Sequence, residues 1–125
     1  EVMAWLAKAQ VLVLTSRMES MPNALAEGFA AGLPVVATAV GGVPELLRDG
    51  LNGYLCASED AEALARAMGR MAGDPAGRER MGRINRRLVA ELLDNRLKGP
   101  KLLAVYAGRR QDEPLDIAGL AREDG

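Results

Sequence analysis

Two apolar runs with a helical segment between them make the clearest pattern in the first forty residues. Residues 11–14 and 34–38 are rich in β-branched side chains without polar alternation, which predicts strands buried on both faces. Between them, residues 22–31 have a helical pattern that begins with Pro22 and is followed by Gly32, as helices commonly begin and end. A strand, a helix and a strand in about 28 residues predict a βαβ unit with a parallel strand pair.

Helical and turn signals alternate through the rest of the chain. The first nine residues predict a short helix, residues 45–49 a second one ended by Gly50, and residues 54–56 a brief strand after a turn. Ser58 is expected to cap a helix with its apolar face at Ala61, Leu64, Ala65, Met68 and Met71, and Asp74-Pro75 starts another. Residues 102–106 predict a last, short helix.

This order of elements predicts an α/β fold with one domain. We expect a Rossmann-like, partial doubly wound parallel sheet with flanking helices and a helical carboxyl-terminal segment. The domain is expected to cover residues 1–108. Residues 109–125 are charged and have few large apolar side chains, which predicts a frayed, disordered tail.

Composition and charge restrict the possible functions. With 125 residues, 49% hydrophobic and 26% charged, the chain has the composition of a soluble globular domain. Only 3% of the residues are aromatic and the net charge is −1, which argues against nucleic-acid binding. No apolar run approaches the ~20 residues of a membrane span. The lone Cys56 fits a reducing compartment, so a cytoplasmic location is expected. The chain contains no histidine, so neither a histidine-based catalytic triad nor a histidine-rich metal site is expected.

Glu19 and Glu27 stand eight positions apart, on either side of Pro22. If residues 11–14 form a strand, the loop after it lies at the carboxyl end of the sheet, where open α/β sheets bind ligands. The backbone at the start of the next helix suits a phosphate, and carboxylates accept hydrogen bonds from sugar hydroxyls. The spacing fits a ligand with phosphate in the middle and hydroxyl groups on either side. The alternative is that both glutamates are solvated surface residues.

Three glycines are open to a structural and a functional interpretation. Gly28 lies inside a predicted helix, where glycine costs about 1 kcal/mol relative to alanine, so tight packing or a close ligand is expected there. Gly41 and Gly42 permit a turn before Pro44-Glu45. Because their loop follows the second strand, Gly41, Gly42 and Glu45 are also candidates for lining a cleft.

A set of ordered motifs resembles the carboxyl-terminal domain of the family 4, or group 1, glycosyltransferases, which have the GT-B fold. The motifs are Glu-x7-Glu at Glu19 and Glu27, then Gly-Leu-Pro-Val-Val from Gly32, Gly-Gly-Val-Pro-Glu from Gly41, and Asp-Gly-Leu-Asn-Gly from Asp49. The resemblance covers about residues 1–90. Ser20 is a departure, because relatives often have glycine at that position.

The resemblance implies roles for individual residues. Glu19 would contact the donor sugar as the catalytic residue, and Glu27 would hold the ribose hydroxyls of the nucleotide. The donor-binding set is completed by Ser16, Arg17, Met21, Pro22, Asn23, Ala24 and Leu25, of which the last five face the diphosphate and sugar through their backbone. For Arg17, a solvated loop arginine is the alternative. A nucleotide-diphosphate sugar is then the donor substrate, the reaction retains anomeric configuration, and no cofactor or metal is required.

The resemblance also implies partners. The acceptor would be a glycan, a lipid or a small molecule, bound through an amino-terminal domain that these residues do not include, and contact with the inner membrane face is left open.

Because the chain starts at Glu1 and not at methionine, we expect a fragment that is inactive alone and exposes a sheet edge suited to self-association. The alternatives are a non-catalytic nucleotide-binding or interaction module and, third, a related epimerase or phosphorylase.

Overall fold

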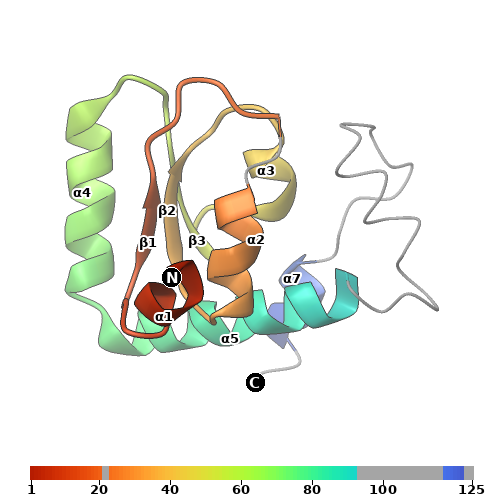
Figure 1. The fold of residues 1–125 in the computed structure, drawn as a ribbon. Helices are drawn as coiled ribbons and strands as arrows, with labels where there is room; N and C mark the ends of the chain where they lie inside the picture. The colour runs from red at the N-terminus through yellow and green to blue at the C-terminus, as the bar shows by residue number, and fades with distance from the viewer. Residues whose placement is uncertain (21–22, 93–116, 123–125) are drawn as a thin grey trace.

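The core of the molecule is a three-stranded parallel sheet (Figure 1). A computed structural model describes residues 1–20, 23–92 and 117–122. The strands β1 (Leu12–Leu14), β2 (Val35–Thr38) and β3 (Gly53–Cys56) lie in the order β1-β2-β3. Both strand pairs are parallel, with Leu12 opposite Val35 and Val35 opposite Gly53. The predicted parallel pairing of the two apolar runs is therefore confirmed.

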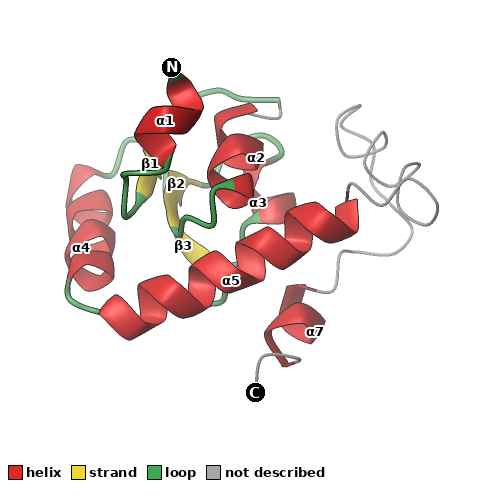
Figure 2. Ribbon diagram, turned by 60° about the horizontal axis from the view of Figure 1, so that its bottom comes forward, coloured by secondary structure: helices red, strands yellow, loops and turns green. Residues whose placement is uncertain are grey.

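Helices cover both faces of this sheet. On one face lie α2 (Asn23–Ala30) and α3 (Val43–Leu46), and on the other face lies α4 (Ala61–Ala72) (Figure 1). The long α5 (Pro75–Leu92) crosses the end of the sheet opposite the loops that follow the strands, and α7 (Ile117–Arg122) packs beside it (Figure 2). This is the expected α/β arrangement with a parallel sheet between helical layers.

Alternate strand residues point into two separate cores, as the pleat of a strand requires. Val35 and Ala37 face the core shared with α2, α3, α5 and α7, whereas Val36 faces the core under α4. Each core also receives buried side chains from the helices, and the first core receives Leu47, just after α3. The helical residues are Leu25, Phe29, Val43, Leu46, Ile84, Leu88 and Ile117 in the first core, and Ala67, Met71 and Met81 in the second. Residues 35–38 are all buried, which explains why 35–37 are apolar without alternation.

The start and the inner face of α4 differ from the prediction. The cap is Asp60, whose Oδ1 accepts a hydrogen bond from the Ala63 N–H at 2.9 Å, and not Ser58. Glu59 has φ 63°, a non-helical backbone that prevents the helix from starting earlier. The buried row consists of Ala67 and Met71, whereas the side chain of Met68 is 44% exposed. The expectation of a core position for Met68 is therefore wrong.

Part of the expected carboxyl-terminal tail is folded. Ile117 is 1% exposed and belongs to the core cluster that contains Leu88. Its spacing to Leu120 and Ala121 gives the short helix α7 an apolar face for α5, so the prediction of a frayed tail is wrong for residues 117–122. The predicted helix at 102–106 lies outside the described residues.

The first helix and the first strand leave apolar surface uncovered by the residues described. In α1 (Val2–Leu6), Val2 is 58% and Trp5 73% exposed, so the large apolar side chains of this helix are not buried. One edge of β1 has no neighbour in the three-stranded sheet. Self-association at that edge stays a prediction. No helix in the described ranges is long and apolar enough to cross a membrane.

A close helix crossing gives the first testable prediction. A Cβ atom on Gly82 of α5 would overlap the carbonyl oxygen of Gly32, which is backbone and cannot move aside cheaply. Gly82→Ala should therefore destabilise the chain by about 1–3 kcal/mol, although alanine is the better helix former. Gly69 in α4 is the matched control, since a Cβ atom there meets nothing within 4 Å. Gly69→Ala should stabilise by about 0.5–1 kcal/mol.

Urea unfolding of the two variants against the unchanged chain measures both effects. If both substitutions shift the midpoint upward to the same extent, Gly82 of α5 does not lie against the carbonyl oxygen of Gly32.

Candidate functional site

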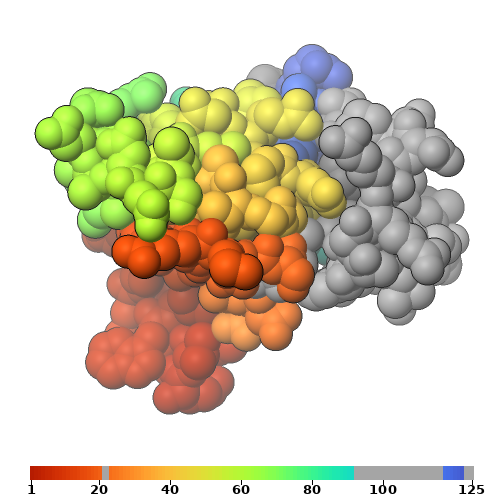
Figure 3. Space-filling view, turned by 90° about the horizontal axis from the view of Figure 1, so that it is seen from above, coloured from red at the N-terminus to blue at the C-terminus, as the bar shows by residue number. Residues whose placement is uncertain are grey.

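An open hollow lies at the carboxyl ends of β1 and β2. It has a volume of about 710 Å³ and is lined by Arg17, Met18, Glu19, Ser20, Val40 and Gly41. Figure 3 looks down on this end of the molecule, where the loop after β1 lies next to the segment after β2. The lining includes residues from both loops that the sequence singled out. Such a position is where open α/β sheets bind their ligands.

The carboxylate of Glu19 is held by its own loop. The hydroxyl of Ser16 donates a hydrogen bond to Glu19 Oε1 at 2.8 Å, and both residues are half-buried. The other oxygen, Oε2, makes no hydrogen bond with any described residue. Ser16, which the sequence assigned to the donor site, therefore orients Glu19 in this structure.

The Gly41-Gly42 turn packs against the backbone of the same loop at Glu19 and Ser20. Gly41 has φ 54°, and a Cβ atom there would overlap the carbonyl oxygen of Glu19. The Gly42 N–H donates to the carbonyl oxygen of Ser20 at 2.8 Å. Only glycine tolerates both the positive φ and this contact at position 41. Of the three residues expected at the cleft, Gly41 lines the hollow. Gly42 does not line it but donates its N–H to Ser20, which does, and Glu45 is exposed on α3 outside the lining.

Glu27 lies on α2, outside the set of residues that line the hollow. Its carboxylate is half-buried and has no hydrogen-bond or ion-pair partner among the described residues. At the start of α2, Asn23 is exposed and Ala24 half-buried, whereas Leu25 is fully buried, backbone included. The predicted positions Met21 and Pro22 lie outside the described residues.

Gly28 has a packing role in the structure. A Cβ atom at this position would come within 2.5 Å of Leu12 Cδ2 on β1. The helix α2 therefore approaches the sheet closely through Gly28, and this contact offsets the propensity cost of a glycine inside a helix. Of the two interpretations open from the sequence, the structure supports tight packing against the sheet.

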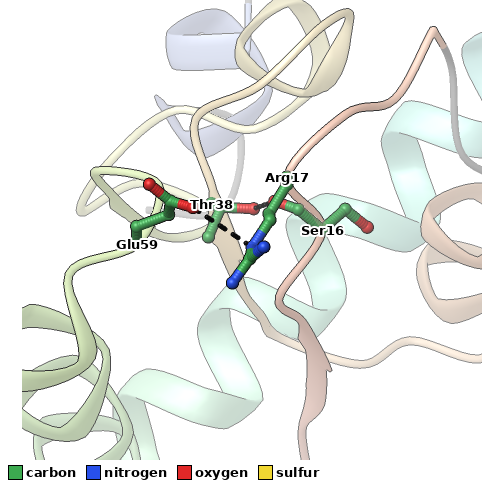
Figure 4. A network of polar contacts seen from close by, with 4 residues as sticks. All are labelled: Ser16, Arg17, Thr38 and Glu59. Carbon is green, nitrogen blue, oxygen red and sulfur yellow. Dashed lines mark hydrogen bonds and ion pairs between the residues drawn. The ribbon is translucent and has the colours of Figure 1, made fainter.

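Arg17 points away from α2 and toward the loop before α4. Its Nε lies 3.2 Å from Glu59 Oε1 (Figure 4), and the two side chains are 81% and 65% exposed. A second hollow of about 340 Å³ lies there, lined by Thr15, Arg17, Thr38, Ala57, Glu59, Asp60, Ala61 and Leu64. An exposed ion pair of this kind contributes little to stability, so Arg17 is free to exchange partners. Nothing in the local sequence pattern identified Glu59.

Cys56 at the end of β3 is not a candidate nucleophile. It is a free cysteine buried in the core under α4. Burial raises the pKa of the Cys56 thiol, and the charges of Asp49 and Asp60 raise it further. The thiol is therefore neutral and acts as a small apolar side chain. No group of three or more acidic, histidine or cysteine side chains in the described ranges could hold a metal ion.

Taken together, the fold and the hollow define an α/β domain with an open hollow at the carboxyl ends of its parallel strands. Comparisons with known proteins identify the family. A family model described as "Glycosyl transferases group 1" matches residues 1–74. The chain belongs to the group 1 glycosyltransferases.

The relatives are longer than this chain. D-inositol 3-phosphate glycosyltransferase of Streptomyces griseus is 49% identical over 78 residues, which are 62% of this chain and 16% of that protein. Glycogen synthase of Mycobacterium tuberculosis is 32% identical over 118 residues, 91% of this chain and 28% of that protein. Among solved structures, sucrose-phosphate synthase of Thermosynechococcus elongatus matches with a TM-score of 0.71 and 31% identity, over 82% of this chain and 26% of that one.

These similarities confirm two expectations from the sequence: the glycosyltransferase family and the fold of a GT-B domain. They leave the roles of individual residues as predictions. The chain spans between 16% and 28% of the length of the two curated relatives described above.

Proposed function

We propose that the chain forms the donor-binding part of a glycosyltransferase that takes its glycosyl group from a nucleotide-diphosphate sugar. The observation that carries this proposal is the position and the hydrogen bonding of the Glu19 carboxylate. Its carboxylate stands at an open hollow beyond β1, with one oxygen held by Ser16 at 2.8 Å and the other without a described partner. A carboxylate oriented in this way suits a ligand hydroxyl, because charge-assisted hydrogen bonds are short and strong.

Glu27 has the second role in this proposal. Its half-buried carboxylate, which no described residue binds, would accept hydrogen bonds from the ribose hydroxyls of the donor. The backbone N–H groups of Asn23 and Ala24 at the start of α2 would face the diphosphate, since the amino end of a helix favours negative charge. Each group would then serve a different part of the same donor.

Glu19→Ala in the complete protein tests the assignment of the sugar. A hydrogen bond to a charged group is worth roughly 1.5–3 kcal/mol, so kcat/KM for transfer from the donor should fall on the order of 10- to 150-fold. Affinity for the free nucleoside diphosphate should stay nearly unchanged, because the proposed partner is the sugar.

Glu62→Ala is the control for that experiment. Glu62 lies on the opposite helix α4, is 92% exposed and faces Arg66 at 4.0 Å, so its loss should leave transfer unchanged. Transfer that is equally fast in the Glu19 and Glu62 variants would show that Glu19 takes no part in the reaction.

The proposal also covers the stereochemistry, the cofactor, the activity of these residues alone, the location and the acceptor. Retention of anomeric configuration and the lack of a cofactor rest on the family. Inactivity of residues 1–125 alone rests on the length of the relatives, since catalysis needs donor and acceptor held together. A cytoplasmic location rests on the free Cys56. The relatives' names include an inositol phosphate glycosyltransferase and a glycogen synthase, which differ in what they build, so we propose no single acceptor.

A further inference from the structure

Thr38, the last residue of β2, makes a hydrogen bond that the strand ladder does not supply. The parallel register of β1 and β2 ends with Leu14 opposite Ala37. One position further, the Thr38 hydroxyl donates to the carbonyl oxygen of Ser16 at 2.6 Å (Figure 4). Thr38 is only 6% exposed, so water competes little for this hydrogen bond. A side chain therefore continues the connection between the strands beyond the end of the ladder.

The hydrogen bond from Thr38 is the first of a short series that ends at Glu19. Ser16, whose carbonyl Thr38 holds, donates its own hydroxyl to Glu19 Oε1 at 2.8 Å. At the other end of the loop, Ser20 is held by the Gly42 N–H at 2.8 Å. The segment 38–42 thus fixes the loop 16–20 at both of its ends.

We propose that Thr38 is a positioning residue, which fixes the backbone of Ser16 and thereby the direction of the Glu19 carboxylate. This inference rests on the proposed function of Glu19 at the donor sugar. A glutamate side chain in an open hollow otherwise samples several rotamers, and a misplacement of about 1 Å reduces a reaction rate severely. Thr38 touches no reacting atom in this scheme and acts only through Ser16.

Thr38→Val and Thr38→Ser in the complete protein separate the hydroxyl from the rest of the side chain. Valine retains the branched shape and removes the donor, so kcat for transfer should fall roughly tenfold while affinity for the free nucleoside diphosphate is unchanged. Serine retains the hydroxyl and should restore most of the rate. A valine variant as active as the unchanged protein, or a serine variant as slow as valine, overturns the proposal.

A double variant distinguishes positioning from a general structural effect. If Thr38 acts through Glu19, Thr38→Val should add no further loss to Glu19→Ala, whereas independent effects would multiply. Multiplied losses overturn the positioning role. If the valine variant does not fold, Ser16→Ala removes the next hydrogen bond and should show the same roughly tenfold loss and the same lack of additivity. A Glu19→Ala variant with full activity would instead refute the proposed function itself.

Discussion

Replacement of Asn85 by alanine should destabilise the 125-residue chain by about 3 kcal/mol or more. Asn85 on α5 is fully buried, and its Nδ2 donates to the carbonyl oxygens of Leu33 at 2.8 Å and Asn52 at 2.9 Å. Its Oδ1 accepts from Asn52 Nδ2 at 2.9 Å. Alanine would leave two carbonyl groups and an amide N–H buried without this partner, at about 1–3 kcal/mol for each group.

The hydrogen bonds lost with Asn85 belong to a larger buried network that also includes Asn52. Asn52 also donates to the carbonyl oxygen of Leu46 at 2.9 Å and accepts from the Arg48 N–H at 2.7 Å. The pair of asparagines therefore joins α5 to the segments before β2 and β3. Buried networks of this kind stabilise when all members are satisfied and cost most when one is removed.

Urea unfolding measures the Asn85 effect, with Asn23→Ala as the control. Asn23 is an exposed asparagine in the first turn of α2, and its replacement should change the free energy of unfolding by less than about 0.5 kcal/mol. An Asn85→Ala variant as stable as the Asn23 variant would show that the buried network does not hold α5.

The Asn52–Asn85 pair illustrates a part of the fold that one sequence does not predict. The two residues are 33 positions apart, and neither has a local pattern that marks it as buried. The same is true of Ile117, whose burial depends on where α5 lies. Met68 was misplaced because the apolar spacing of α4 admits more than one face, and contact with the sheet decides among them.

Features with a local physical cause were predicted well. The β-branched runs of β1 and β2 form the parallel pair, and Gly32 and Gly41 have the positive φ values that only glycine adopts readily. For the candidate site, the sequence placed Glu19 in the loop beyond β1. It did not predict that Ser16 and Thr38 hold this loop, since those hydrogen bonds depend on how two loops meet in space.

Replacement of Glu27 by alanine should weaken binding of a nucleoside diphosphate to the complete protein on the order of 10- to 150-fold. The reason is the loss of charge-assisted hydrogen bonds to the ribose hydroxyls, worth roughly 1.5–3 kcal/mol. The Glu27 carboxylate has no hydrogen-bond or ion-pair partner among the described residues, so the substitution should leave folding almost unchanged. The Glu62→Ala control on α4 should bind the nucleotide as tightly as the unchanged protein.

Calorimetric titration of the complete protein and its Glu19→Ala and Glu27→Ala variants, with nucleoside diphosphate and with intact donor, tests the central claim most directly. The claim is that the two glutamates hold different ends of one nucleotide-diphosphate sugar. We predict that Glu27→Ala weakens binding of both ligands, whereas Glu19→Ala leaves the affinity for free nucleoside diphosphate nearly unchanged and reduces only sugar-dependent binding and transfer. Equal, unchanged affinities in all three proteins, with transfer preserved, would contradict the account and make both glutamates solvated surface residues.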